Sequence, residues 1–152
     1  MPLAARIDPR HDARSAIVMP ISQMLKKLIT FASAAEIATG LALLVAPEIV
    51  IALLIGGDEP VRAMPLARVA GIVLLALGVA CWPPGGSATS EPPAVRAMLM
   101  YNALIALYLA YLFTAGHLGG VLLWPAVLMH AVVAIMLAWA WRAERSAPAG
   151  GA

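Results

Sequence analysis

The sequence predicts an all-α, polytopic membrane protein, because it contains four long apolar segments and few charges. The segments cover residues 28–46, 64–82, 97–115 and 118–141, and each is about long enough to cross a ~30 Å hydrocarbon core at ~1.5 Å per helical residue. Hydrophobic residues make up 62% of the 152 residues and charged residues 12%, which leaves too little polar surface to cover a soluble domain. We therefore expect a four-helix transmembrane bundle over residues 24–142.

The positions of lysine and arginine predict the orientation of the spans, because short cytoplasmic loops are enriched in these residues. Basic residues precede the first span, separate the second from the third and follow the fourth. They are Arg6, Arg10, Arg14, Lys26, Lys27, Arg96, Arg142 and Arg145. In the connection between the first two spans, Arg62 is offset by Asp58 and Glu59. Both termini are therefore expected on the cytoplasmic side.

The flanks of the spans have compositions typical of flexible chain. Residues 1–23 alternate charge with proline and alanine and contain no apolar stretch of the kind found in signal peptides, so we expect a disordered cytoplasmic extension. Met24, which precedes Lys26 and Lys27, is an alternative start to Met1. Residues 83–93 are expected to form a flexible linker, and residues 143–152 a flexible cytoplasmic tail.

A short interfacial or re-entrant helix is expected over residues 47–55, directly after the first span. Pro47 suits the first turn of a helix, and Glu48 would interact favourably with the positive helix end. Gly56 and Gly57 would end this helix. The alternative is one long tilted first helix with a kink. Pro125 is expected to kink the fourth helix near the outer face.

Three spans each hold one ionisable residue at a depth where lipid would surround it: Glu36, Arg68 and His130. Such residues are costly there unless they face the bundle interior or water, so they are the first candidates for a functional site. Glu36 and His130 fall at matching depths near the midplane, and Arg68 lies within about two helical turns of the outer surface. Glu36 could form an ion pair with Arg68, or it could contact His130 or a tyrosine hydroxyl, and the sequence leaves this choice open.

Helical spacing predicts which side of each span faces the other helices. The expected inward faces are Ser33, Glu36, Thr39 and Gly40 in the first span; Arg68, Gly71, Leu75 and Gly78 in the second; Tyr101, Ile105, Tyr108 and Leu112, with Asn102 beside them, in the third; and Ala126, His130, Val133, Ala134 and Leu137 in the fourth. The intramembrane polar candidates are thus Glu36, Arg68, His130, Asn102, Tyr101 and Tyr108. Asn102 is expected to act as an interhelical hydrogen-bonding group.

The sequence contains no motif of a known catalytic site, such as a phosphate-binding glycine loop, a nucleophile elbow or a zinc-protease helix. Glu36 and His130 are too few buried donors for a zinc site, so no metal is expected. The basic residues flank the spans and form no patch with interleaved aromatic residues, which argues against nucleic acid as a partner. The expected partners are the lipid bilayer and another membrane protein or a second copy of this chain.

Residues 24–142 resemble the DoxX-like families of small bacterial four-helix membrane proteins. The resemblance rests on Ala67-Arg-Val-Ala-Gly-Ile-Val-Leu-Leu-Ala-Leu-Gly78, which looks like the pattern opening one of their spans, and on Glu36-Ile-Ala-Thr-Gly40 followed by Pro47. Tyr101-Asn102 and Leu123-Trp-Pro-Ala-Val-Leu-Met-His130 are also similar to short proteobacterial inner-membrane proteins without assigned activity. The resemblance implies a bacterial inner-membrane location and, more distantly, a link to quinone-dependent oxidation.

Two functional hypotheses follow. The first is a non-enzymatic accessory or assembly subunit, in which polar residues inside the membrane hold the bundle together or dock a partner. The second is a quinone-linked redox component, or a component that transports protons or small solutes, in which Glu36, Arg68 and His130 line a cavity. An open polar cavity at these residues would favour the second hypothesis, and a closed bundle with mutually satisfied side chains the first.

Overall fold

The structure is a computed structural model that describes residues 9–56, 64–83, 92–116 and 119–146, with side chains from Ile21 onward. These residues are helical apart from short connections, which confirms the predicted all-α class for this part of the chain. The helices are α1 (Pro9–Val45), α2 (Pro47–Leu54), α3 (Met64–Ala80), α4 (Pro92–Ala115) and α5 (Leu123–Ser146).

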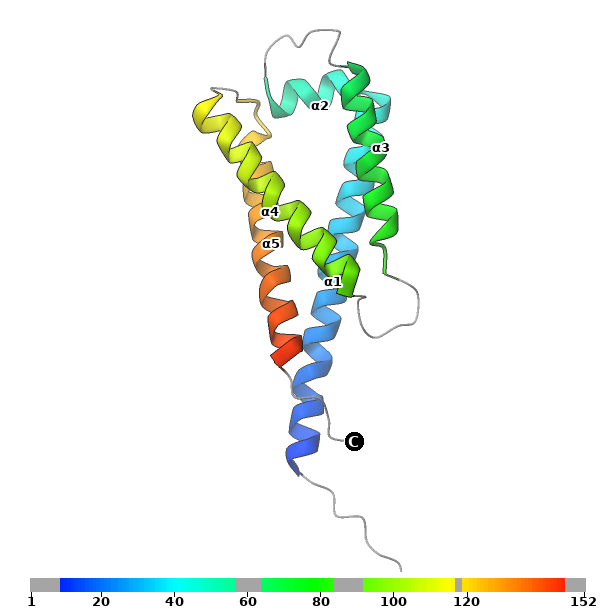
Figure 1. The fold of residues 1–152 in the computed structure, drawn as a ribbon, viewed down its shortest axis with the longest axis vertical. Coiled ribbons are helices and arrows are strands. Elements are labelled where there is room, and N and C mark those ends of the chain that lie inside the picture. Colours follow the sequence, from blue (N-terminus) through cyan, green and yellow to red (C-terminus); the bar gives the residue numbers. More distant parts are fainter. Residues whose placement is uncertain (1–8, 57–63, 84–91, 117–118, 147–152) are drawn as a thin grey trace, which may run out of the picture.

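The four longer helices run alternately up and down, and α1 contacts each of the others (Figure 1). α3 packs along one side of α1, while α4 and α5 pack against each other on its other side. The short α2 lies across the end of α1 and α3, in the view of Figure 1 at the top. The last helical turn of α5 and the first half of α1 lie at the opposite end. This arrangement places α1 at the centre of the fold.

Three helical segments are long and apolar enough to cross a membrane. They are Ile21–Val45, Pro92–Ala115 and Leu123–Ser146, of 25, 24 and 24 residues. α3 is equally apolar but has 17 residues, which at ~1.5 Å per residue extend about 26 Å. The structure therefore supports a membrane-embedded protein with at least these three candidate spans.

The helices differ from the predicted spans mainly at their ends. α1 already begins at Pro9, so residues 9–23 are helical where we predicted a disordered extension. Alanine and arginine between Arg10 and Ala16 favour helix, and Pro20 removes one backbone hydrogen bond without ending α1. α5 continues to Ser146, so the first four residues of the predicted flexible tail, 143–146, are also helical. Residues 1–8 and 147–152 lie outside the described part.

The predicted short helix is confirmed as α2. Its N-cap residue, Ala46, has φ −139° and ψ 63°, which breaks the helical path after α1, and Pro47 occupies the first turn with Glu48 beside it. Gly56 follows the helix with φ +79°, a conformation that glycine adopts without steric cost. The alternative of one long kinked first helix is therefore wrong.

The connection between α4 and α5 is fastened to the end of α2. Gly119, Gly120 and Leu122 donate backbone hydrogen bonds of 2.9, 3.2 and 2.8 Å to the carbonyl oxygens of Ile55, Leu54 and Leu53, respectively. These bonds satisfy carbonyl groups that the end of a helix leaves without intrahelical partners. They also join the α1–α3 side of the molecule to the α4–α5 side at this end.

This connection explains where α5 begins, which differs from the start of the predicted fourth span. The predicted span began at residue 118, but α5 begins at Leu123, because Gly119 and Gly120 are used in the contact with α2. Pro125 was expected to kink the helix, but it is the third residue of α5. In the first turn the missing backbone N–H has no intrahelical partner to lose, so a proline is accommodated at this position.

α1 and α3 approach closely through small residues. A Cβ atom added to Gly40 would lie 2.7 Å from the carbonyl oxygen of Gly71 and 2.7 Å from the amide nitrogen of Leu75. A Cβ atom on Gly78 would lie 2.7 Å from the carbonyl oxygen of Ser33. Small residues allow this backbone contact between helices in a membrane. The predicted inward positions of the three glycines are thus confirmed.

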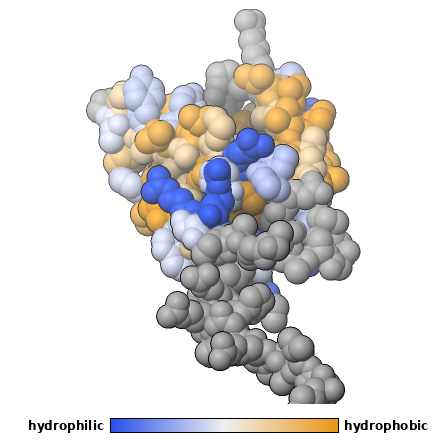
Figure 2. All heavy atoms as spheres, turned by 60° about the horizontal axis from the view of Figure 1, so that its bottom comes forward, coloured by the Kyte–Doolittle hydropathy of each residue, from blue (hydrophilic) through white to orange (hydrophobic). Residues whose placement is uncertain are grey.

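The surface of the molecule is largely apolar. Outward-facing residues of α3, α4 and α5 include Leu66, Val69, Ile72, Leu104, Leu107, Leu128 and Ile135, all of them more than half exposed. Hydrophilic residues gather instead at the end of the molecule that Figure 2 brings forward. A soluble protein buries such side chains, whereas exposed apolar faces of this extent are typical of membrane contact.

Candidate functional site: a buried polar cluster

Four polar side chains from three helices meet in the interior, and we call Glu36, Tyr101, Asn102 and His130 the polar cluster. α1 contributes Glu36, α4 contributes Tyr101 and Asn102, and α5 contributes His130. Glu36 and Asn102 are 2% exposed and His130 is 8% exposed, although each stands in an otherwise apolar helix. The polar cluster therefore lies on the buried faces of α1, α4 and α5.

Glu36 is bound by a tyrosine. The Tyr101 hydroxyl forms a side-chain hydrogen bond with the Glu36 carboxyl group. A tyrosine O–H can donate to a carboxyl oxygen whether the acid is ionised or neutral. This bond links α1 to α4, two helices that otherwise make little contact with each other.

His130 is bound by an asparagine. His130 Nδ1 and Asn102 Oδ1 are 2.8 Å apart, and Asn102 Nδ2 donates to the Met98 carbonyl oxygen over 2.8 Å. Because Oδ1 is only an acceptor, His130 Nδ1 carries the proton and donates it. The bond to Met98 fixes the orientation of the asparagine amide. α4 and α5 are therefore joined by a directional hydrogen bond in addition to their apolar packing.

Tyr101 connects the two halves of the cluster. Its ring and the His130 ring stand edge to face, with centroids 5.8 Å apart and planes at 81°. Aromatic rings prefer this arrangement. The cluster is therefore continuous from Glu36 through Tyr101 to His130 and Asn102, and it spans α1, α4 and α5.

The polar cluster lies between two apolar clusters. On one side are Leu25 and Ile29 of α1 with Met98 and Leu137, and on the other is a smaller group formed by Leu109, Leu123 and Val127. Hydrogen bonds in such surroundings have few water competitors, and an unpaired polar group there is costly. The mutual pairing of the four side chains therefore matters for the stability of the fold.

One hydroxyl near the cluster is unsatisfied. Ser33 is fully buried one helical turn before Glu36, and its Oγ atom has no hydrogen-bond partner among the described residues. The Ser33 backbone is the part of α1 that Gly78 of α3 approaches. We predicted Ser33 on the inward face of the first span but assigned it no role.

Arg68 and Tyr108 do not join the cluster. Arg68 is exposed on α3, and within the described part of the chain it forms no ion pair with Glu36. The expectation that Arg68 points at a partner helix was therefore wrong, although Gly71 and Gly78 of the same predicted face are buried. Tyr108 is 57% exposed. Thr39, predicted to lie on the inward face of α1, is exposed as well.

The buried face of α4 is rotated from the predicted one. The prediction placed Tyr101, Ile105, Tyr108 and Leu112 inward, with Asn102 to one side. Instead the buried residues of α4 are Val95, Met98, Asn102, Ala106 and Leu109. Both series have helical spacing and are largely apolar, so periodicity alone does not distinguish them. In α5 the predicted face is buried at His130, Val133, Ala134 and Leu137.

Asn102→Leu tests the α4–α5 hydrogen bond. This variant keeps the side-chain volume but leaves His130 Nδ1 without its acceptor, so we expect unfolding in detergent to become easier by about 1 kcal/mol, the scale of interhelical hydrogen bonds in membranes. Tyr108→Phe is the matched control, because it removes an exposed hydroxyl from the same helix and should leave the midpoint unchanged. Equal unfolding midpoints for Asn102→Leu and the parent protein would show that the Asn102–His130 hydrogen bond does not contribute to stability.

The comparisons with known proteins provide no relative. No protein-family model, no curated protein and no solved structure matches this chain. Among the described residues, no group of three or more histidine, cysteine, aspartate or glutamate side chains is placed to hold a metal ion.

Proposed function

We propose that this chain is an integral membrane protein that crosses the bilayer four times, through α1, α3, α4 and α5. The observation that carries the proposal is the apolar exterior of the fold together with polar side chains buried inside it. Leucine, isoleucine and valine cover the outside, while Glu36, Asn102 and His130 are buried. α3 is the shortest of the four helices, and a shorter span is accommodated by local thinning of the bilayer at modest cost.

The topology can be tested with reporter fusions. One apolar cluster contains side chains from residues 24–28 of α1, from residues 94–99 of α4, and from Leu137, Ala140 and Trp141 of α5. This packing brings four basic residues to the same end of the molecule: Lys26, Lys27, Arg96 and Arg142. By the positive-inside rule this end is cytoplasmic. Fusions at both termini and within residues 83–93 should therefore report the cytoplasm, and a fusion near Asp58 the outside. A cytoplasmic Asp58 would contradict four crossings.

The role that fits the geometry best is that of an accessory or assembly subunit, with the polar cluster as a structural element. Its four side chains are paired with one another or packed together; Glu36, Asn102 and His130 are buried and Tyr101 is partly buried. This is the arrangement expected of polar residues that fix the register of helices in a membrane. The partner of such a subunit is another membrane protein or a second copy of this chain.

A second function is favoured by one observation, the unpaired Ser33 hydroxyl next to Glu36. Buried polar groups without a protein partner are sites at which water or a proton can be held. Tyr101 contacts Glu36, and His130 contacts Tyr101, so these side chains form a continuous series. In this second function the series would serve a quinone-linked redox reaction or proton movement. Arg68 takes no part in this version because it is exposed on α3.

Purification from native membranes separates the two functions. Mass spectrometry of the mildly solubilised protein should identify a protein partner, or a second copy of the chain, in fixed stoichiometry. Quinone should be present at no more than its share of the bulk lipid. Quinone at one equivalent per chain, lost in Glu36→Gln or Tyr101→Phe, would instead support the redox role. The proposal includes a DoxX-like relationship and a location in the bacterial inner membrane. Recovery of the protein from the inner-membrane fraction during this purification tests the location.

A further inference from the structure

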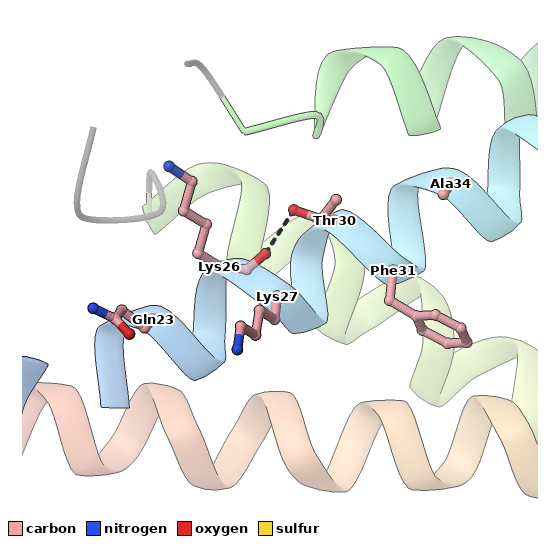
Figure 3. A pocket seen from close by; sticks show the side chains of 6 residues that line it. All are labelled: Gln23, Lys26, Lys27, Thr30, Phe31 and Ala34. Carbon is pink, nitrogen blue, oxygen red and sulfur yellow. Dashed lines mark hydrogen bonds between the residues drawn. The ribbon is translucent and has the colours of Figure 1, made fainter. Parts of the chain in front are cut away.

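An open groove runs along the outward face of α1 near its basic end (Figure 3). The groove has a volume of about 510 Å³ and is lined by Gln23, Lys26, Lys27, Thr30, Phe31 and Ala34. Successive lining positions are one or three residues apart and fall within one sector of the helix surface, with α3 and α5 seen to either side. The groove is separate from the polar cluster, since none of its lining residues belongs to the cluster.

Polarity changes along the groove. The amide of Gln23 and the ammonium groups of Lys26 and Lys27 lie at one end, and the apolar side chains of Phe31 and Ala34 lie at the other. At ~1.5 Å per residue, Lys27 and Ala34 are about 10 Å apart along the helix, which fits within one ~15 Å leaflet of the hydrocarbon core. The groove therefore extends from the membrane surface into the region of the acyl chains.

The side chains that could contact a ligand differ in their availability. Thr30 Oγ1 donates to the Lys26 carbonyl oxygen over 2.8 Å, so its proton is used within the helix. Lys27 is exposed and forms no ion pair within the described residues. Phe31 is 54% exposed, and Ala34 beside it is small and exposed, which leaves a trough next to the phenyl ring. An ammonium group thus stands above an apolar trough.

The surrounding charge is positive. Arg96 of α4 and Arg142 and Arg145 of α5 belong to the same end of the molecule, and Glu144 is the acid among the described side chains there. Arg145 lies over the Trp141 ring, 4.9 Å from its centroid, which directs this arginine onto α5. A ligand headgroup at this end therefore meets a net positive potential.

We infer that the groove binds an anionic phospholipid of the cytoplasmic leaflet. The phosphate is placed at the exposed Lys27, the glycerol hydroxyl groups at Gln23, and one acyl chain lies over Ala34 against Phe31. A lysine near the surface of an anionic membrane contributes attraction for such headgroups, whereas a zwitterionic lipid brings a positive group that reduces it. This inference rests on the membrane insertion proposed above.

Native mass spectrometry of the full chain tests the site. With equimolar phosphatidylglycerol and phosphatidylcholine in detergent, we expect bound phosphatidylglycerol to exceed phosphatidylcholine. Lys27→Gln should lower this preference by about fivefold. Arg142→Gln is the control of equal charge at the same end and should keep most of the preference. Equal losses in the two variants would show a general effect of charge and overturn the site.

Two further measurements test whether the apolar trough holds an acyl chain. Ala34→Trp fills the trough but keeps both lysines and their influence on topology, so it should lower phosphatidylglycerol binding several-fold, and unchanged binding would overturn the inference. Soluble glycerol phosphate should compete poorly because it lacks the acyl chains. Displacement of the lipid by equimolar glycerol phosphate would reduce the site to an anion contact and also overturn it. A chain that is released from membranes by alkaline carbonate would instead contradict the membrane insertion itself.

Discussion

Replacing Gly40 with valine should separate α3 from α1 and give the largest loss of stability of any single substitution considered for this chain. Even a Cβ atom at Gly40 would lie 2.7 Å from both the Gly71 carbonyl oxygen and the Leu75 amide nitrogen. Both neighbours are backbone atoms, which cannot be relieved by a change of rotamer. We expect a cost of about 3 kcal/mol or more, the upper end of the range for overpacked cores, measured as the midpoint of unfolding in detergent.

Ala38→Val is the matched control for this prediction. Ala38 lies in the same turn region of α1 but is exposed, so the added methyl groups contact lipid or detergent. The control has the same β-branched side chain as Gly40→Val and should change the midpoint little. Similar losses in the two variants would attribute the effect to helix propensity and would contradict the close α1–α3 contact as its cause. Gly78→Val should behave like Gly40→Val, because a Cβ atom there meets the Ser33 carbonyl oxygen at 2.7 Å.

Removing the Tyr101 hydroxyl should give the second large effect. Tyr101→Phe leaves the buried Glu36 carboxyl group without its donor, and an unsatisfied buried polar group costs about 1–3 kcal/mol. Glu36→Gln keeps an acceptor for the tyrosine and should cost less. Adding Glu36→Leu to Tyr101→Phe removes the stranded carboxyl group, so the double variant should lose less than the sum of the two single variants. Unfolding midpoints in detergent give all four corners of this cycle.

Arg68→Met is the control that distinguishes the Tyr101–Glu36 hydrogen bond from a Glu36–Arg68 ion pair, the alternative that the sequence left open. Arg68 is exposed and unpaired with Glu36, so its replacement should leave both the midpoint and the effect of Glu36→Gln unchanged. If Arg68→Met destabilised the protein and Glu36→Gln rescued it, the ion pair would exist and the Tyr101 bond would not account for the burial of Glu36. If the losses of stability caused by Glu36→Leu and Tyr101→Phe were strictly additive, this would also contradict the hydrogen bond. The effects of substituting two residues that interact directly are not additive.

Features that depend on neighbours along the chain could be predicted from the sequence. The length of the apolar runs indicated the helices, Pro47 with Gly56 indicated α2, and the spacing of Gly71 and Gly78 indicated a close-packing face. Each of these follows from local backbone geometry or from the 3.6-residue period, which acts over a few turns of one helix. The ends of the helices were less well predicted, because the start of α5 depends on a contact with α2 that is distant in sequence.

Which polar residues meet depends on the packing of the helices and could not be predicted from the sequence. Arg68, Tyr101 and His130 were all possible partners of Glu36, and the rotation of α4 places Tyr101 against it while Tyr108 turns outward. The position of α3 on the far side of α1 leaves Arg68 exposed. The physical reason is that periodicity defines the polar face of one helix, whereas the partner of that face depends on the packing of side chains from all helices at once. The pairing of Asn102 with His130, 28 residues apart, is of the same kind.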